Sequence, residues 1–211
     1  MSNISIKSFQ QPEVFEFSPE NKKKIESIIK KYPEGKQASA VMPLLDMAQL
    51  QHNGWIPEKA MEEIGRILDM PPIRVFEVAT FYTMYNLEPK GEHHLQVCTT
   101  TPCWLSGSAD VVNACEKDLG IKMGETTTDG KFSLSEVECL GACVNAPVIQ
   151  RNGEELYEDL NPENVIEVLD ALKDNKTIKH GSQIGRNNST GVQGATCLHK
   201  EAKKAGVKDA N

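Results

Sequence analysis

Two stretches decide the fold of this 211-residue chain: Cys98-Thr99-Thr100-Thr101-Pro102-Cys103 and Cys139-Leu140-Gly141-Ala142-Cys143. Both are short, uncharged loops, with four residues between the first two cysteines and three between the second two. Two such loops, brought together by the fold, supply what a four-thiolate iron–sulfur or zinc site requires. Backbone N–H groups at 99–101 and 140–142 are placed to offset the negative charge of the sulfurs.

A strand pattern precedes each loop. Residues 95–97 predict a short strand that runs into Cys98, and residues 132–137 predict a second strand that delivers Cys139. Strand ends on one edge of a small sheet lie close together. The sequence therefore predicts that four sulfurs converge on one centre, without identifying the metal.

The remaining pattern after residue 90 is mixed. Residues 102–119 show helical spacing, Asn152-Gly153 predicts a hairpin with a two-residue primed turn, and residues 162–172 predict a final helix capped by Asn161. The order strand, helix, strand, hairpin, helix fits a thioredoxin-like domain with a small four-stranded sheet.

The first ninety residues predict helices. Ser18-Pro19-Glu20 combines an N-cap hydroxyl, a first-turn proline and an acidic residue. Further helices are expected over about 39–51, from about 57, and after Pro71-Pro72, the last with Val75, Phe76, Ala79, Phe81 and Tyr82 in its apolar pattern. The predicted class is α+β: an N-terminal helical bundle (1–90), a thioredoxin-like domain (91–175) and a C-terminal extended arm (176–211).

Composition excludes several function classes. A net charge of −7 argues against nucleic-acid binding, and no stretch approaches the roughly 20 apolar residues of a membrane span. The N-terminus has neither a secretory signal nor a transit-peptide pattern, so we expect a bacterial cytosolic protein or a mature form. In a reducing cytosol, six cysteines indicate metal binding or catalysis before disulfides.

Cysteine spacing narrows the choice of centre. Zinc ribbons usually use two-residue gaps, and a plant-type ferredoxin needs a further cysteine two residues on, whereas the next one here is Cys115. A Rieske centre needs two histidines, and a thioredoxin-type enzyme needs Cys-x-x-Cys; the loops hold neither. The spacing favours a two-iron cluster, with zinc and disulfides as the alternatives.

Other reactive side chains have simpler interpretations. Cys115 shares a helical face with Val111 and Leu119, which predicts a buried structural thiol, and Cys197 lies in the polar tail without an evident role. His93-His94 are expected at a solvated or interface position ahead of the strand.

The second cysteine loop also carries a family resemblance. Asp129-Gly130-Lys131-Phe132-Ser133, five residues, then Cys139 to Pro147 resembles the signature of the 24 kDa subunit of respiratory complex I, the E subunit of bacterial NADH:quinone oxidoreductase. The likeness covers roughly 15–185. It implies one [2Fe–2S] cluster bound by Cys98, Cys103, Cys139 and Cys143, beside the flavin but off the main electron chain.

The resemblance also implies partners: a flavoprotein subunit that holds FMN and oxidises NADH, and other peripheral-arm subunits of complex I. The chain would then lie at the cytoplasmic side of the inner membrane, or the matrix side in mitochondria. The sequence agrees, because it contains no Gly-x-Gly-x-x-Gly turn, phosphate loop or nucleophile–base pair. We therefore expect no catalytic site in this chain alone. Alternatives are the equivalent subunit of a NAD-linked hydrogenase or formate dehydrogenase, and a zinc-stabilised interaction module.

Overall fold

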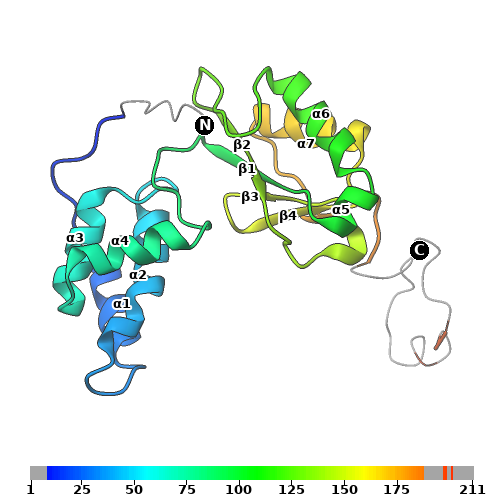
Figure 1. Cartoon of the computed structure of the whole chain (residues 1–211). Coiled ribbons are helices and arrows are strands. Elements are labelled where there is room, and N and C mark those ends of the chain that lie inside the picture. Colours follow the sequence, from blue (N-terminus) through cyan, green and yellow to red (C-terminus); the bar gives the residue numbers. More distant parts are fainter. Residues whose placement is uncertain (1–8, 188–196, 199–200, 202–211) are drawn as a thin grey trace. The chain divides into compact units, whose positions relative to one another are not determined.

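The computed structural model describes residues 9–187, 197–198 and 201 (Figure 1). The chain divides between Lys90 and Gly91 into two compact units, and each is described by itself. Much of the stretch predicted as an extended arm, namely 188–196, 199–200 and 202–211, lies outside the described residues. In the part of the chain that the structure describes, no helix is long and apolar enough to cross a membrane.

The first unit contains four α-helices: α1 (Pro19–Ile29), α2 (Val41–Gln51), α3 (Glu58–Leu68) and α4 (Pro72–Phe81). A 3₁₀ turn, η1 (Gln37–Ala40), leads into α2. The predicted start of α1 is confirmed, since the Ser18 hydroxyl accepts a hydrogen bond from the Asn21 N–H. The helices enclose one core, whose fully buried members include Leu44, Leu45, Ala60, Ile64 and Val75.

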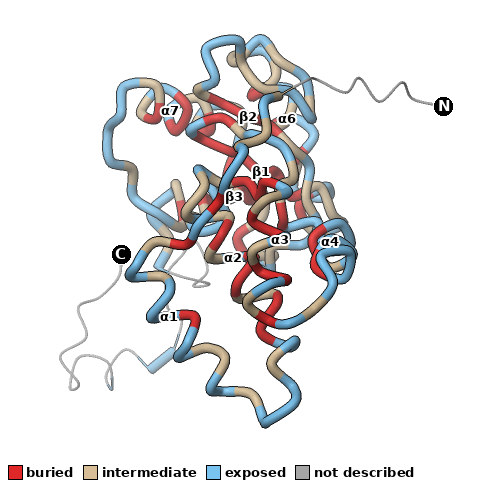
Figure 2. Tube along the Cα trace, turned by 90° about the vertical axis from the view of Figure 1, so that its left-hand side faces the viewer, coloured by how far each residue is buried: buried red, intermediate tan, exposed pale blue. Residues whose placement is uncertain are grey.

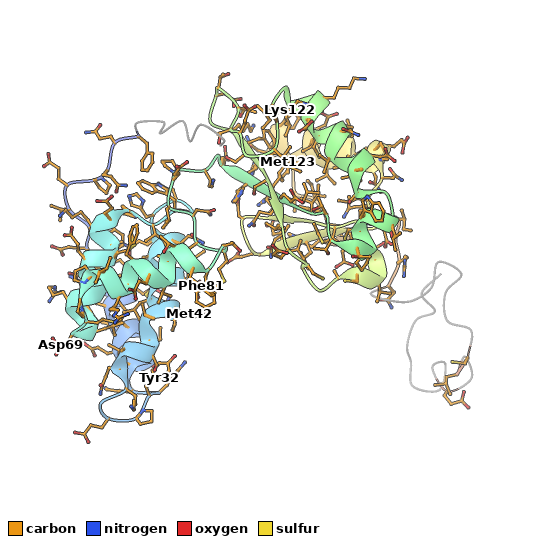
Figure 3. All side chains as sticks on the ribbon, viewed as in Figure 1. Tyr32, Met42, Asp69, Phe81, Lys122 and Met123 are labelled. Atoms are coloured by element: carbon orange, nitrogen blue, oxygen red, sulfur yellow. The ribbon has the colours of Figure 1, made fainter. Side chains whose placement is uncertain are left out.

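The aromatic end of α4 differs from the sequence pattern. Val75 and Ala79 are buried as expected, but Phe81, labelled in Figure 3, is 76% exposed and stacks edge-on against the exposed Tyr82. The apolar spacing in the sequence includes Phe81 and Tyr82. However, α4 ends at Phe81, and neither side chain is buried in the core.

The second unit is a mixed sheet with helices. Its strands are β1 (His93–Cys98), β2 (Phe132–Val137), β3 (Ile149–Arg151), β4 (Glu155–Glu158) and β5 (Gly181–Ser182), in the order β2-β1-β3-β4-β5. The pairs β1–β2 and β4–β5 are parallel, and the others are antiparallel. The helices are α5 (Thr101–Leu105), α6 (Ser108–Leu119) and α7 (Pro162–Lys173), with a 3₁₀ turn η2 (Cys143–Asn145).

Helices α6 and α7 pack side by side over the sheet (Figure 1). They bury a core with the inward residues of β1 and β2, along which buried positions, in red, are concentrated in Figure 2. Helix α7 begins at the predicted Asn161 cap, whose side chain accepts from the N–H groups of Glu163 and Asn164. This core fixes β1 and β2 side by side and in register.

Three predictions about this unit need correction. The sheet has five strands, because residues 181–182, placed in the extended arm, pair with β4. The helical pattern of 102–119 is two helices, because Gly107 has a φ of 95° and interrupts it. The hairpin pairs Arg151 with Glu155, so its loop has three residues; Asn152 and Gly153 nevertheless have the positive φ values of a primed turn.

Candidate metal centre

The first cysteine loop starts where β1 ends. Cys98 is the last residue of β1, and Cys103 lies in α5, which begins at Thr101 after the extended residue Thr100. Both cysteine side chains are buried, each 1% exposed, and together with Val148 they form a small apolar cluster separate from the main core. The Thr100 Oγ1 lies 3.3 Å from the Cys98 sulfur.

The second loop starts two residues after β2. Cys139 is exposed, and Cys143, at the start of η2, is half-buried. Their sulfur atoms are 3.3 Å apart. Gly141 has a φ of 80°, a left-handed conformation that glycine adopts readily, and it turns the chain so that the two thiols face each other.

The structure brings the two loops together. β1 and β2 are parallel neighbours, with Cys98 opposite Val137, so their carboxyl ends reach the same edge of the sheet. The backbone N–H of Leu140, in the second loop, lowers the pKa of the Cys98 thiol in the first. The Thr100 hydroxyl, in the first loop, lowers the pKa of Cys139 in the second. The two pairs of cysteines therefore lie at the same edge of the sheet, with Leu140 and Ala142 of the second loop packed against the cluster of Cys98 and Cys103.

The thiols differ in how readily they ionise. Burial opposes ionisation of Cys98, but hydrogen bonds, led by that from the Thr100 hydroxyl, outweigh it and hold its pKa below the ordinary value. Burial, with the adjacent Cys98, raises the pKa of Cys103 to about 12. The Gly141 N–H lowers the pKa of Cys139, and Cys139 in turn raises that of Cys143. Four ionised sulfurs at this edge would repel one another, so a cationic centre is needed to hold them all as thiolates.

This donor set suits iron–sulfur chemistry. It consists of sulfur alone, with amide and hydroxyl donors directed at the sulfurs, as thiolate-bound clusters require. Within the described ranges, no three or more Cys, His, Asp or Glu side chains already stand at coordinating positions. Cys98, Cys103, Cys139 and Cys143 are the residues that would hold a cluster at this edge.

The sequence predicted the amide donors of both loops, but it did not indicate two further groups that act on the cysteine thiols. One is the Thr100 side chain, which serves Cys98 and Cys139 at once. The other is the Val148 N–H, which acts on the Cys103 thiol from outside both loops. No spacing rule marks Val148, because only the antiparallel pairing of β1 with β3 brings the residue beside the first loop.

The sequence also led to expectations for the other two cysteines and for His93 and His94. Cys115 is fully buried in α6, and burial raises its pKa to about 12, which confirms a structural thiol; Cys197 is exposed. The expectation for the two histidines was wrong, because His93 and His94 belong to β1 and are 7% and 6% exposed. Trp104 is 63% exposed beside Cys103.

Comparison with known proteins agrees with this fold and identifies the family. Residues 25–173 match the family of thioredoxin-like [2Fe–2S] ferredoxins, and the chain belongs to that family. It is 55% identical to the E subunit of the NADH-quinone oxidoreductase of Rickettsia bellii, over 75% of this chain and 95% of that protein. It is 50% identical to the mitochondrial NADH dehydrogenase [ubiquinone] flavoprotein 2 of Dictyostelium discoideum, over 87% of this chain and 74% of that protein.

Among solved structures, a NAD⁺-reducing [NiFe]-hydrogenase superposes with a TM-score of 0.56 at 18% identity. The alignment covers 64% of this chain and 23% of the hydrogenase chain. An identity this low shows a shared fold alone, whereas the relatives at 50–55% identity are subunits of NADH dehydrogenases.

Proposed function

We propose that Cys98, Cys103, Cys139 and Cys143 bind one [2Fe–2S] cluster, and that the chain is the electron-transfer subunit of the NADH dehydrogenase module of NADH:quinone oxidoreductase. The observation that carries this proposal is the packing of the two loops against each other, in which Leu140 and Ala142 of the second loop lie against the buried cluster that holds Cys98 and Cys103 of the first. The family and the E-subunit relatives support the cluster and the complex.

The bound cluster would accept and return one electron at a time. The protein's residues prepare the site for that exchange. The thiols release their protons on ligation, and the Thr100 hydroxyl and the Leu140 and Gly141 amides disperse the charge that remains on sulfur. Burial of Cys98 and Cys103 keeps water from one side of the site, while the exposed Cys139 lies on the side from which an electron can enter.

The electron donor in this proposal is a separate flavoprotein subunit that binds FMN and NADH. Exposed apolar side chains next to the cysteines support a partner at this edge: Trp104 and Leu105 follow Cys103, and Val144 follows Cys143, each 63–73% exposed. With other peripheral-arm subunits, the complex would hold the chain at the cytoplasmic side of the inner membrane, or the matrix side in mitochondria. Residues 1–90 and 91–175 would act as two domains, followed by the arm 176–211.

The cluster assignment is tested on protein purified without oxygen. We expect a red-brown protein with about two irons per chain and a rhombic electron paramagnetic resonance signal after reduction by dithionite. Serine at any of the four cysteines should abolish the colour, whereas the matched control Cys115→Ser should keep it. A colourless protein with stoichiometric zinc would refute the cluster and favour the interaction module.

The complex is tested separately, by identifying the proteins that co-purify with the tagged chain from its own cells. A flavoprotein that oxidises NADH, together with quinone-reducing subunits, is expected. Recovery of hydrogenase or formate dehydrogenase subunits instead would overturn the respiratory assignment while leaving the cluster assignment intact.

A further inference from the structure

A buried ion pair joins the segment after β5 to the turn after β4. The Arg186 Nη1 lies 2.9 Å from the Asp159 Oδ1, and the two side chains are only 13% and 6% exposed. The other Asp159 oxygen is buried without a hydrogen-bond partner among the described residues. A carboxylate this buried needs a nearby cation, and Arg186 supplies it.

The Asp159 turn is in turn fastened to the second cysteine loop. The Asp159 N–H donates to the Asn145 carbonyl at 2.6 Å, and the Asn145 side-chain amide donates to the Glu158 carboxylate at 2.6 Å. Next along the turn, the Leu160 N–H donates to the Pro147 carbonyl at 3.1 Å. Asn145 is two residues beyond Cys143, so these bonds hold the end of the loop that carries Cys139 and Cys143.

On its other side, the turn is held by the segment that contains Arg186. The Gln183 N–H donates to the Glu158 carbonyl at 3.0 Å, and the Arg186 N–H donates to the Ser182 hydroxyl at 3.1 Å. Asp159 itself has a φ of 55°, a left-handed conformation that a non-glycine residue keeps only when its surroundings fix it. The ion pair with Arg186 is the side-chain contact among them, and both of its members are largely buried.

The loop and the segment after β5 also line a common cavity. This cavity of 390 Å³ is lined by Gly141, Ala142 and Val144 of the loop and by Arg186 of the segment 179–187. The segment and the cysteine loop are connected through Asp159, which pairs with Arg186 by its carboxylate and donates a backbone hydrogen bond to Asn145.

We propose that Arg186 is a positioning residue for the cluster: by pairing with Asp159 it fixes the loop that presents Cys139 and Cys143. This inference rests on the proposed cluster assignment. In this role, the segment after β5 holds the loop of the more exposed pair of thiolates against the metal. Without the ion pair between Arg186 and Asp159, the loop would open more often and expose the iron to solvent.

The test uses the full chain with its cluster and follows loss of visible absorbance when an iron chelator is added without oxygen. We expect Arg186→Met to release iron at least tenfold faster than the unmodified protein, and Arg186→Lys, which keeps the charge, to stay within about threefold. The matched control is Lys176→Met, which breaks an exposed ion pair with Asp174 in the stretch between α7 and β5 and should leave the rate unchanged.

A double variant, Asp159→Asn with Arg186→Met, separates positioning from the penalty of an unpaired buried charge. This variant leaves no unpaired buried charge, so it should fold. Because it lacks the ion pair, it should still release iron at least fivefold faster than the unmodified protein. Release at the unmodified rate in the double variant would overturn the proposal, as would a lowered melting temperature of Arg186→Met without faster release. Absence of a cluster from the unmodified protein would instead refute the proposed function.

Discussion

Thr100→Val tests whether the threonine hydroxyl tunes the redox centre. The substitution removes one hydroxyl and preserves the side-chain shape. The hydroxyl lies 3.3 Å from the Cys98 sulfur and also lowers the pKa of Cys139. Thr100 precedes α5 at the N-cap position, but its side chain makes no capping hydrogen bond, so its loss should not destabilise the helix. The expected effect is therefore on the centre and not on the fold.

The size of the effect follows from the change in charge on reduction. A hydrogen bond to a charged acceptor is worth about 1.5–3 kcal/mol. Both oxidation states accept this bond, and it is stronger by about 1 kcal/mol in the more negative reduced state. For one electron, 1.4 kcal/mol corresponds to about 59 mV, so Thr100→Val should lower the reduction potential by roughly 40 mV.

The assay is a redox titration of the purified chain, followed by visible circular dichroism or electron paramagnetic resonance. Thr101→Val, at an exposed position of the same loop, is the matched control and should leave the potential within about 10 mV. A potential for Thr100→Val that equals the control, or that rises, would refute the assigned role of the hydroxyl.

Three further predictions concern stability. Gly91→Ala places a methyl carbon 2.9 Å from the Ser133 amide nitrogen, so denaturant unfolding should show a loss of about 1–3 kcal/mol; a loss below about 0.5 kcal/mol would contradict the close approach. Leu169→Ala, at a fully buried position, should cost about 2–5 kcal/mol in the same assay, and an unchanged midpoint would argue against the described core. Burial, reinforced by Arg151, lowers the pKa of His93, so below about pH 6.5 the unfolded state binds more protons and stability falls as pH falls, by up to about 1.4 kcal/mol per pH unit. His93→Phe should remove that part of the slope between pH 6.5 and 5.5, and an unchanged slope would refute it.

Helix starts and cysteine loops were predictable because their signals are local. The Ser18 and Asn161 side chains accept from N–H groups two or three residues away, and helices α1 and α7 begin where the sequence predicts. Cys98 was likewise predicted at a strand end, since alternation of apolar residues is visible within a few positions. The predicted convergence of the two loops needed one more assumption, that β1 and β2 share an edge, and their parallel pairing confirms it.

The missed features depend on distant neighbours. β5 has two residues, too few for any periodic pattern, and forms only because β4 offers it a free edge. The burial of His93 and His94 comes from sheet position and not from polarity. The helical spacing across Gly107 was genuine, but it could not show that the chain turns there.

By itself, the sequence predicted which atoms the candidate centre would offer: four sulfurs, in two loops, each following a strand. Only the tertiary structure decided what surrounds them, namely the packing of Leu140 and Val148 against Cys98 and Cys103, and the pairing of Arg186 with Asp159. The reason is that ligand identity and spacing are properties of short segments, whereas hydrogen bonds and ion pairs between segments depend on a register that the whole sheet sets.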